Sequence, residues 1–220
     1  MSNPSPSTDI LSAPQQAIVP IAAFAAAGDL TRLDAALHAG LDAGLSIGDI
    51  REVLTQLYAY AGFPRSLNAL GGLMKVVAAR QAQGTEDAAG AAPGRPIPTG
   101  EALLAAGTAN QTRLAGGPVG GPLFDFAPAI GEYLRTHLFG DIFERDNLDW
   151  PSREIATLGM LAALPGAEPQ LQAHVRIGMN VGITAVQLRQ LAQVLAEQVG
   201  ADAALRARDA MAQQFAAAGH

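Results

Sequence analysis

Residues 170–184 read QLQAHVRIGMNVGIT, and residues 32–46 read RLDAALHAGLDAGLS. In both stretches apolar and small residues recur every three or four positions, which is the spacing of an amphipathic helix. A glycine, Gly44 or Gly182, stands near the end of each stretch. Because glycine adopts a positive φ at little cost, it commonly ends a helix. The two stretches therefore predict two copies of one helix and its following turn.

The similarity between the two stretches extends along the chain. An offset of 138 positions aligns them without a gap, and further identities follow in the same register. Examples are Gly28 with Gly166, Leu33 with Leu171, Gly40 with Gly178, Arg51 with Arg189, Leu57 with Leu195, and Gly62 with Gly200. Ser46 and Thr184 occupy equivalent positions and favour the N-cap of a following helix. This pattern indicates an internal structural repeat.

The composition favours closely packed helices. Hydrophobic residues make up 49% of the 220 residues, aromatic residues only 5%, and charged residues 15%. Alanine is abundant, whereas a β-sandwich would contain more valine, threonine and aromatic residues. We therefore expect an all-α protein with a core of substantial size.

Several classes of protein are disfavoured by the bulk numbers. The net charge is −6 and no Lys/Arg-rich run occurs, so nucleic acid is not an expected partner. The absence of cysteine excludes disulfides, thiolate catalysis and cysteine metal sites. No uninterrupted apolar run of about 18 residues predicts a membrane span, and the N-terminal sequence does not have the pattern of a signal peptide. We expect a cytoplasmic protein.

The chain divides by composition into four parts. Residues 1–14 are rich in Ser and Pro and predict a disordered arm, and residues 15–83 predict the first helical repeat. Residues 84–122 are rich in Gly, Pro and Ala, and we expect a connection with about one helical turn that wraps a surface or crosses between the repeats. Residues 123–220 predict the second repeat. Both repeats are expected to form one compact unit.

Four segments together resemble the carboxymuconolactone decarboxylase family, within the wider alkylhydroperoxidase-D-like group. They are FGDIFERDNLDWPSRE at 139–154, IATLGMLAALPG at 155–166, the stretch at 170–184 quoted above, and GLSIGDIREVLTQLYAYAGFP at 44–64. The resemblance places the family's helix histidine at His174. It implies an all-α alkylhydroperoxidase-D-like helical bundle, here with two pseudo-repeats.

The order of these segments departs from the family pattern. In a single-unit member the histidine helix is followed directly by the Tyr-x-Gly-x-Pro turn, but here the turn belongs to the first copy and the histidine to the second. A complete set of motifs must therefore be assembled from both halves or across subunits. The family's common trimers and hexamers imply a homo-oligomer. The peroxidase branch uses a Cys-x-x-Cys pair, which this chain lacks, so a thiol peroxidase is excluded.

His174 is the central candidate for catalysis. On the bare sequence, a histidine on an apolar helix face is most simply a core residue bonded to a backbone carbonyl. The resemblance, together with Ala36 at the equivalent position of the first copy, favours a catalytic proton donor or base.

Arg145 and Arg153 are candidates for binding a substrate carboxylate, since arginine can hold a carboxylate through two hydrogen bonds. The alternative for Arg145 is a helical pair with Asp141, four residues away. The alternative for Arg153 is a solvated residue in the first turn of a helix. The resemblance places arginines at both positions.

Glu52 and Tyr60 complete the candidate site. Glu52 lies off the apolar stripe of its helix, which predicts a solvated position, whereas the resemblance makes it a catalytic partner that orients a histidine or a water. Tyr60 is either an amphipathic core residue or a phenol donor to an oxyanion. We predict His174 and Glu52 as catalytic residues, and Arg145, Arg153 and Tyr60 as substrate-binding residues.

The resemblance implies a lyase of aromatic-compound catabolism that resembles 4-carboxymuconolactone decarboxylase. Its substrate would be a small lactone or an enolisable carboxylic acid. Because such a lactone delocalises the electron pair left by carbon dioxide, neither an organic cofactor nor a metal is expected. Two alternatives are a proton-transfer enzyme of the same fold, an isomerase or hydrolase that releases no carbon dioxide, and a non-catalytic oligomeric binding protein.

Overall fold

The computed structural model describes residues 10–218, which contain helices and loops and no β-strand. The all-α expectation is therefore confirmed. The helices before the connection are α1 (Ala13–Ala27), α2 (Leu30–Asp42), α3 (Ile47–Gln56) and α4 (Tyr58–Ala82). The connection and the segment after it carry α5 (Gly100–Ala115), α6 (Pro122–Phe126), α7 (Pro128–Tyr133) and the π-helix η1 (Leu134–Ile142). The remaining helices are α8 (Trp150–Ala162), α9 (Glu168–Asn180), α10 (Ala185–Val194), the π-helix η2 (Leu195–Val199) and α11 (Ala201–Ala218).

The internal repeat is a structural repeat. Shifted by 138 positions, the bounds of α2 and α3 coincide with those of α9 and α10. The turn glycines agree as well, since Gly44 and Gly182 have φ of 96° and 98°. Ser46 and Thr184 each cap the following helix in a capping box, as predicted.

The two copies also break their last helix at equivalent glycines. Gly62 leaves the helical conformation inside α4, with ψ of 161°, and Gly200 stands before α11 with ψ of 162°. The apolar pattern of the second copy fades after Gly200, yet α11 occupies the place that the later part of α4 has in the first copy.

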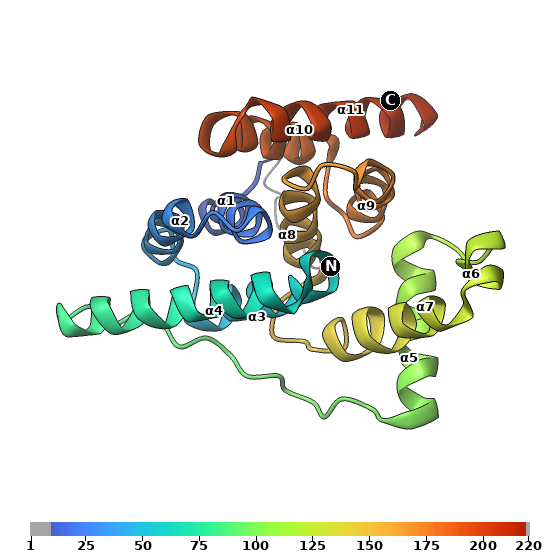
Figure 1. The fold of residues 1–220 in the computed structure, drawn as a ribbon, viewed down its shortest axis with the longest axis horizontal. Coiled ribbons are helices and arrows are strands. Elements are labelled where there is room, and N and C mark those ends of the chain that lie inside the picture. The colour runs from blue at the N-terminus through green and yellow to red at the C-terminus, as the bar shows by residue number, and fades with distance from the viewer. Residues whose placement is uncertain (1–9, 219–220) are drawn as a thin grey trace, which may run out of the picture.

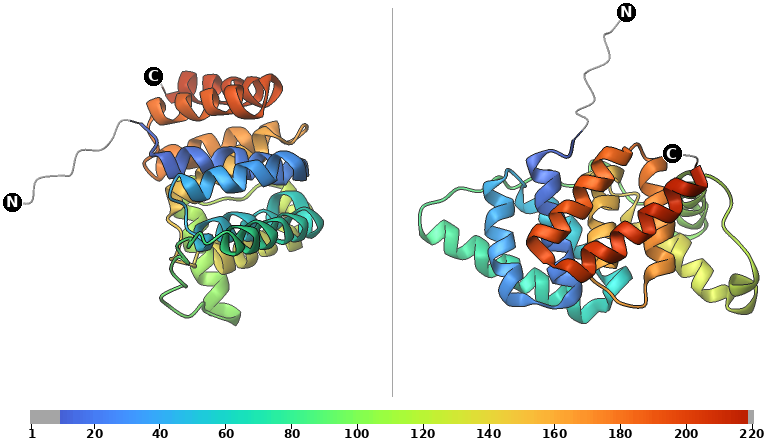
Figure 2. Two further views of the ribbon diagram at one scale, coloured as in Figure 1. Left: turned by 90° about the vertical axis from the view of Figure 1, so that its left-hand side faces the viewer. Right: turned by 90° about the horizontal axis from the view of Figure 1, so that it is seen from above.

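The helices stack in layers. In Figure 1, α1, α2, α8 and α9 lie in the middle, α3 and α4 lie on one side of them, and α10 and α11 lie on the other. The side view in Figure 2 shows the same order, with α10 and α11 outermost at the top. The two repeats thus place their third and fourth helices on opposite faces of a shared middle layer.

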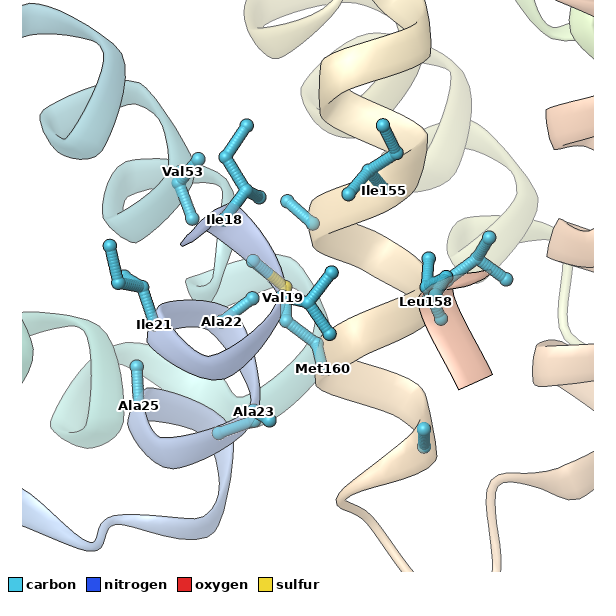
Figure 3. Close-up of a cluster of buried hydrophobic side chains, with 14 of the residues drawn as sticks. Ile18, Val19, Ile21, Ala22, Ala23, Ala25, Val53, Ile155, Leu158 and Met160 are labelled. Carbon is cyan, nitrogen blue, oxygen red and sulfur yellow. The ribbon is translucent and has the colours of Figure 1, made fainter. Parts of the chain in front are cut away.

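The core is centred where α1 crosses α8. Figure 3 shows Ile18, Val19 and Ala22 of α1 facing Ile155 and Leu158 of α8. These side chains are buried, and the bulk of the apolar core surrounds them. Burial of this kind is the main favourable contribution to folding, roughly 25 cal/mol for each Å² of apolar surface removed from water.

The backbones approach closely at the same crossing. A Cβ atom at Gly159 would lie 2.9 Å from the carbonyl oxygen of Val19. The position therefore requires glycine for the observed distance between α1 and α8.

The N-terminal region is more ordered than predicted from residue 10 onward. Leu11 is buried, Ser12 caps α1 in a capping box with Gln15, and α1 already begins at Ala13. The prediction of a disordered arm is therefore wrong for residues 11–14, and the first nine residues of that arm lie outside the described residues. Leu11 is held because it packs into the core.

The connection at 84–122 differs from the prediction of about one helical turn, because it contains the 16-residue helix α5. Tertiary contacts hold this Gly/Ala-rich helix. Leu114 is fully buried, and a Cβ at Gly107 would overlap the carbonyl oxygen of Arg135 in η1. The prediction was wrong because the composition does not reveal these contacts.

The segment before α5 crosses between the two repeats. The carbonyl oxygens of Ala88 and Ala89 accept hydrogen bonds from the first residues of α3. Farther along, Gly94 donates its N–H to the carboxylate of Asp146 at 2.7 Å, and Asn147 donates to the carbonyl oxygen of Ala91. Within residues 10–218 no helix has both the length and the apolar character needed to cross a bilayer.

Candidate active site

Helix α8 positions the buried polar residues of the candidate site. Asp149 caps the helix by accepting a hydrogen bond from the backbone of Ser152. Arg153, Glu154 and Thr157 follow on the first two turns, and all three are buried. Since α8 is buried on every side from Ser152 to Ala162, the interpretation of Arg153 as a solvated first-turn residue is wrong.

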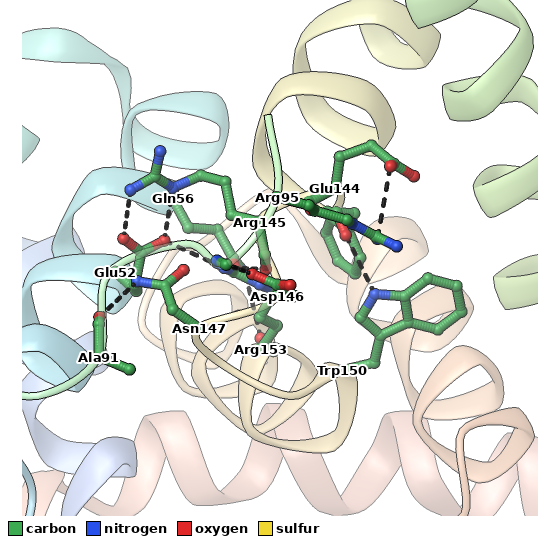
Figure 4. Close-up of polar contacts among 12 residues, drawn as sticks. Glu52, Gln56, Ala91, Arg95, Glu144, Arg145, Asp146, Asn147, Trp150 and Arg153 are labelled. Atoms are coloured by element: carbon green, nitrogen blue, oxygen red, sulfur yellow. Dashed lines mark hydrogen bonds and ion pairs between the residues drawn. The ribbon is translucent and has the colours of Figure 1, made fainter. Parts of the chain in front are cut away.

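Glu52 of α3 joins both predicted arginines. Arg145 donates two hydrogen bonds to its carboxylate, at 2.8 and 2.7 Å, and Arg153 donates one at 3.0 Å. Figure 4 shows the facing Glu52 and Arg145 side chains with these contacts. Glu52 is only 1% exposed and Arg153 is fully buried. The prediction of a solvated position for Glu52 is therefore wrong, because the two arginines neutralise it inside the fold.

The alternative for Arg145 is also wrong. Its side chain bonds Glu52, while Asp141 bonds His137 at 2.9 Å instead. One carboxylate thus faces two guanidinium groups, and the cluster carries a formal excess of one positive charge. Both arginines predicted to bind a substrate carboxylate are already engaged by Glu52.

The pKa values in this cluster follow from these contacts. Burial acts to raise the pKa of Glu52, but hydrogen bonds from Arg145, Asn147 and Arg153 outweigh it and lower that pKa to about 2. Burial lowers the pKa of Arg153, opposed by its hydrogen bond to Glu52. The hydrogen bond to Glu52 raises the pKa of Arg145. Glu52 is therefore ionised at neutral pH and is unsuited to accept a proton there.

Gln56 extends the network along α8. Its amide nitrogen donates to the hydroxyl of Thr157 at 2.7 Å and to the carbonyl oxygen of Arg153 at 3.1 Å. Arg153 in turn donates to the amide oxygen of Gln56 at 3.4 Å. The network therefore connects the arginine cluster with the second turn of α8.

His174 of α9 is paired with a carboxylate. Its Nδ1 atom lies 2.7 Å from Oε2 of Glu154, which is fully buried. His174 as a whole is 8% exposed. The core-histidine alternative required a backbone carbonyl as partner, whereas the observed partner is an acid that can orient the ring.

Tyr60 lies against the same imidazole. The two ring centroids are 5.6 Å apart and the rings are nearly perpendicular, at 76°. The hydroxyl of Tyr60 and atom Oε1 of Glu154 are buried without a hydrogen-bond partner among the described residues. Burial raises the pKa of Tyr60, and the charge of Glu154 raises it further. Tyr60 therefore keeps its proton, so its hydroxyl can donate a hydrogen bond.

The structure assembles both clusters from the two repeats within one chain. Glu52 and Tyr60 come from the first copy, and Arg145, Arg153 and His174 come from the second. The arginine cluster and the histidine cluster meet on α8, because Arg153 belongs to the first and the adjacent Glu154 belongs to the second. Among residues 10–218 no group of three or more His, Asp or Glu side chains is placed to hold a metal ion.

Glu154, Gln56 and Thr157 were missed from the sequence. A signal for Glu154 was present, because the segment that follows it, IATLGMLAALPG, is apolar on all sides. A helix with that pattern is buried all round, so the charged residues at its start must be buried and paired too.

The comparison with known families agrees with the fold. The model of the carboxymuconolactone decarboxylase family matches residues 8–73 and 128–213. The chain belongs to this family. Each matched range covers one of the two repeats, as expected for a fusion of two family units. No curated protein matches the chain.

Membership in the carboxymuconolactone decarboxylase family also shows which parts lie outside the common unit. Residues 74–127, with the whole of α5, fall between the two matched ranges. The clusters around Glu52 and His174 fall within them. These clusters are therefore built on the shared fold, whereas α5 lies outside both matched ranges.

Proposed function

We propose that this protein is a cofactor-independent lyase that acts on a small lactone or enolisable carboxylic acid, as 4-carboxymuconolactone decarboxylase does. The observation that carries the proposal is the pair of His174 and Glu154 beside the unbonded hydroxyl of Tyr60. An imidazole oriented by a carboxylate is a common device for moving protons near neutral pH.

The proposed reaction breaks the bond between the substrate carbon and its carboxylate. Carbon dioxide leaves, and the electron pair delocalises through the alkene into the lactone carbonyl. The hydroxyl of Tyr60 donates a hydrogen bond to the developing oxyanion. His174 returns one proton to carbon from Nε2 while Nδ1 remains bonded to Glu154, and the imidazole then takes a proton from water.

A second candidate is proton transfer without loss of carbon dioxide. It is favoured by the contacts of Arg145 and Arg153, because Glu52 already occupies both groups that would hold a carboxylate. The same imidazole would then remove a proton beside a carbonyl group and return it to another carbon, as an isomerase does.

The test is an assay of the purified protein with 4-carboxymuconolactone. Release of carbon dioxide and formation of the enol-lactone are followed together, in water and in deuterium oxide. The His174→Ala variant is expected to lose about 10²–10⁴-fold in turnover, the range for removal of a general acid or base. Deuterium uptake without carbon dioxide would favour the second candidate.

Two outcomes decide against the proposed mechanism. The first is full turnover by His174→Ala, which would exclude His174 as the proton donor or base in both candidates. The second is the absence of both carbon dioxide release and deuterium exchange for the wild-type protein across a panel of small lactones and enolisable acids, which supports a binding protein. His137→Ala is the control, because His137 also pairs with a carboxylate but lies on the exposed surface.

We also propose that the protein forms homo-oligomers through α4. Phe63, Leu67 and Met74 are exposed along one side of this helix, and exposed apolar rows of this kind often mark interfaces. Light scattering during size-exclusion chromatography tests this. Leu67→Glu should shift an oligomer toward smaller species, and a monomeric wild-type protein would contradict the proposal.

A further inference from the structure

A surface cavity of about 470 Å³ lies where the inserted helix α5 meets the start of α8 and the end of α9. Its lining residues are Arg113, Trp150, Pro151, Asn180, Val181 and Gly182. Cavities of this size accommodate small molecules. Because α5 lies outside both family-matched ranges, the cavity depends in part on a helix outside the matched family unit.

Arg113 is exposed, packs over an aromatic ring and has no counter-charge within residues 10–218. Its guanidinium carbon lies 4.8 Å from the centroid of the Trp150 ring. Among the described residues it makes no ion pair, in contrast to Arg145 and Arg153, which share Glu52. An arginine over an aromatic face keeps its N–H edges available for a planar anion.

The surroundings of Arg113 are fixed by hydrogen bonds and packing. The indole N–H of Trp150 donates to the carbonyl oxygen of Phe143 at 3.2 Å. Asn180 donates its amide to the carbonyl oxygen of Leu114 at 2.8 Å, next to Arg113 in sequence. Leu114 is fully buried. Such preorganisation lowers the entropic cost of binding a ligand.

We propose that this cavity binds a small carboxylate with a planar apolar body. The carboxylate pairs with the guanidinium of Arg113, and the apolar body packs against Pro151 and Val181. Val181 follows His174 by seven residues, which corresponds to about 10 Å along a helix axis. Neither His174 nor Glu154 nor Tyr60 lines the cavity, and the inference does not depend on the proposed function.

Trp150 provides the measurement, since it is the only tryptophan in the chain. Benzoate is titrated into the full-length protein while the tryptophan emission is followed, and calorimetry gives the affinity independently. Benzamide, which has the same shape without the charge, is the ligand control. We expect saturable binding of benzoate and at least about tenfold weaker binding to Arg113→Gln, since hydrogen bonds to charged groups are the strong ones.

Arg189→Gln is the matched control variant. Arg189 also lies over an aromatic ring, with its guanidinium carbon 5.2 Å from the centroid of Phe215, but it stands on α10, away from the cavity. The affinity of the Arg189→Gln variant for benzoate should stay within about twofold of that of the wild type, as expected for a substitution at a distant site. His174→Ala should also retain the wild-type affinity, whether or not it retains turnover.

Four results would overturn the inference. These are the absence of saturable benzoate binding to the wild type, equal affinity of Arg113→Gln, equally tight binding of benzamide, and loss of binding in His174→Ala. The last result would place the ligand at the imidazole instead. Calorimetry matters here because the Arg113→Gln substitution itself alters the emission of Trp150.

Discussion

His174 and Ala36 occupy equivalent positions in the two repeats, but the side chains around these positions differ in charge. The charged or titratable residues around His174 have uncharged counterparts around Ala36. At the offset of 138 positions, Glu52 corresponds to Gln190, Arg153 to Gln15, Glu154 to Gln16, Tyr60 to Gln198 and His174 to Ala36. Equivalent helices of the two repeats thus support a charged network around His174 and an amide network around Ala36.

In the amide network around Ala36, glutamine side chains bond to backbone groups of Leu11. The N–H of Leu11 donates to the side-chain oxygen of Gln190 at 2.6 Å, and the carbonyl oxygen of Leu11 accepts from Gln16 at 2.8 Å. One peptide segment satisfies both amides. A buried carboxylate, by contrast, requires a charged partner, and Glu52 has two. The difference shows that the fold itself does not demand charge at this position.

Truncation of Glu52 should have the largest effect on stability. Glu52→Ala leaves Arg153 buried without its counter-charge, and breaking a buried pair typically costs 3–5 kcal/mol, so we expect a loss of about 4 kcal/mol. Gln190→Ala, the equivalent change in the other repeat, removes one hydrogen bond to a backbone group and should cost about 1 kcal/mol. Urea unfolding of both variants measures the difference.

Similar losses for the two variants would mean that the charged network contributes no more than the amide network. A variant of Glu52 that does not fold at all is replaced by Glu52→Gln, for which the same order is expected. The control for a general effect on α3 is Arg51→Ala, because Arg51 is exposed on the same helix.

The fold and part of the site could be predicted from these same positions. Gly44 and Gly182 predict the turns because their conformational requirement is local, and the offset of 138 gives the pairing of helices. The contact between Glu52 and Arg145 spans 93 residues of sequence and that between Glu52 and Arg153 spans 101. No local pattern encodes such partners, so the arginines were assigned to substrate.

The acid dependence of stability should sharpen the comparison. The pKa of Glu52 is about 2 in the folded chain against an ordinary value of 4.5. A lowered pKa adds stability above the ordinary value, and this contribution is lost as the pH falls from about 4.5 to about 2, by about 3 kcal/mol in total. Gln190, at the equivalent position in the other repeat, carries an amide that does not titrate.

The measurement is the unfolding free energy of the wild type and of Glu52→Ala at several pH values in this range. Their difference should shrink as the pH falls, because protonated Glu52 no longer stabilises the fold. A difference that stays constant down to about pH 2 would show that the interaction with Arg145 and Arg153 does not depend on the charge of Glu52.

A histidine introduced into the other repeat should have a smaller effect. Ala36→His places an imidazole at the position equivalent to His174, but Gln16 replaces the acid that would pair with it. Ala36 is buried, so the larger polar side chain should cost about 1–3 kcal/mol. Turnover of any substrate identified for the protein should not rise above that of the wild type.

An increase in turnover by Ala36→His would show that the imidazole alone is sufficient and that the acid is dispensable. The double variant Ala36→His with Gln16→Glu separates the two requirements, since it restores the acid at the position equivalent to Glu154. Recovery of the lost stability in the double variant would indicate that the new pair has formed.

Substitution of Gln16 alone should have the smallest effect on stability. Gln16→Ala removes the hydrogen bond to the carbonyl oxygen of Leu11, and we expect a loss of about 1 kcal/mol, the usual net contribution of one hydrogen bond between uncharged groups. The equivalent change, Glu154→Ala, deprives His174 of its partner and should reduce turnover strongly while Gln16→Ala leaves it unchanged. Thermal unfolding and turnover, measured on both variants, test this. If Gln16→Ala reduced turnover as much as Glu154→Ala does, the two networks would be functionally coupled. The distinction between a catalytic charged network around His174 and a structural amide network around Ala36 would then fail.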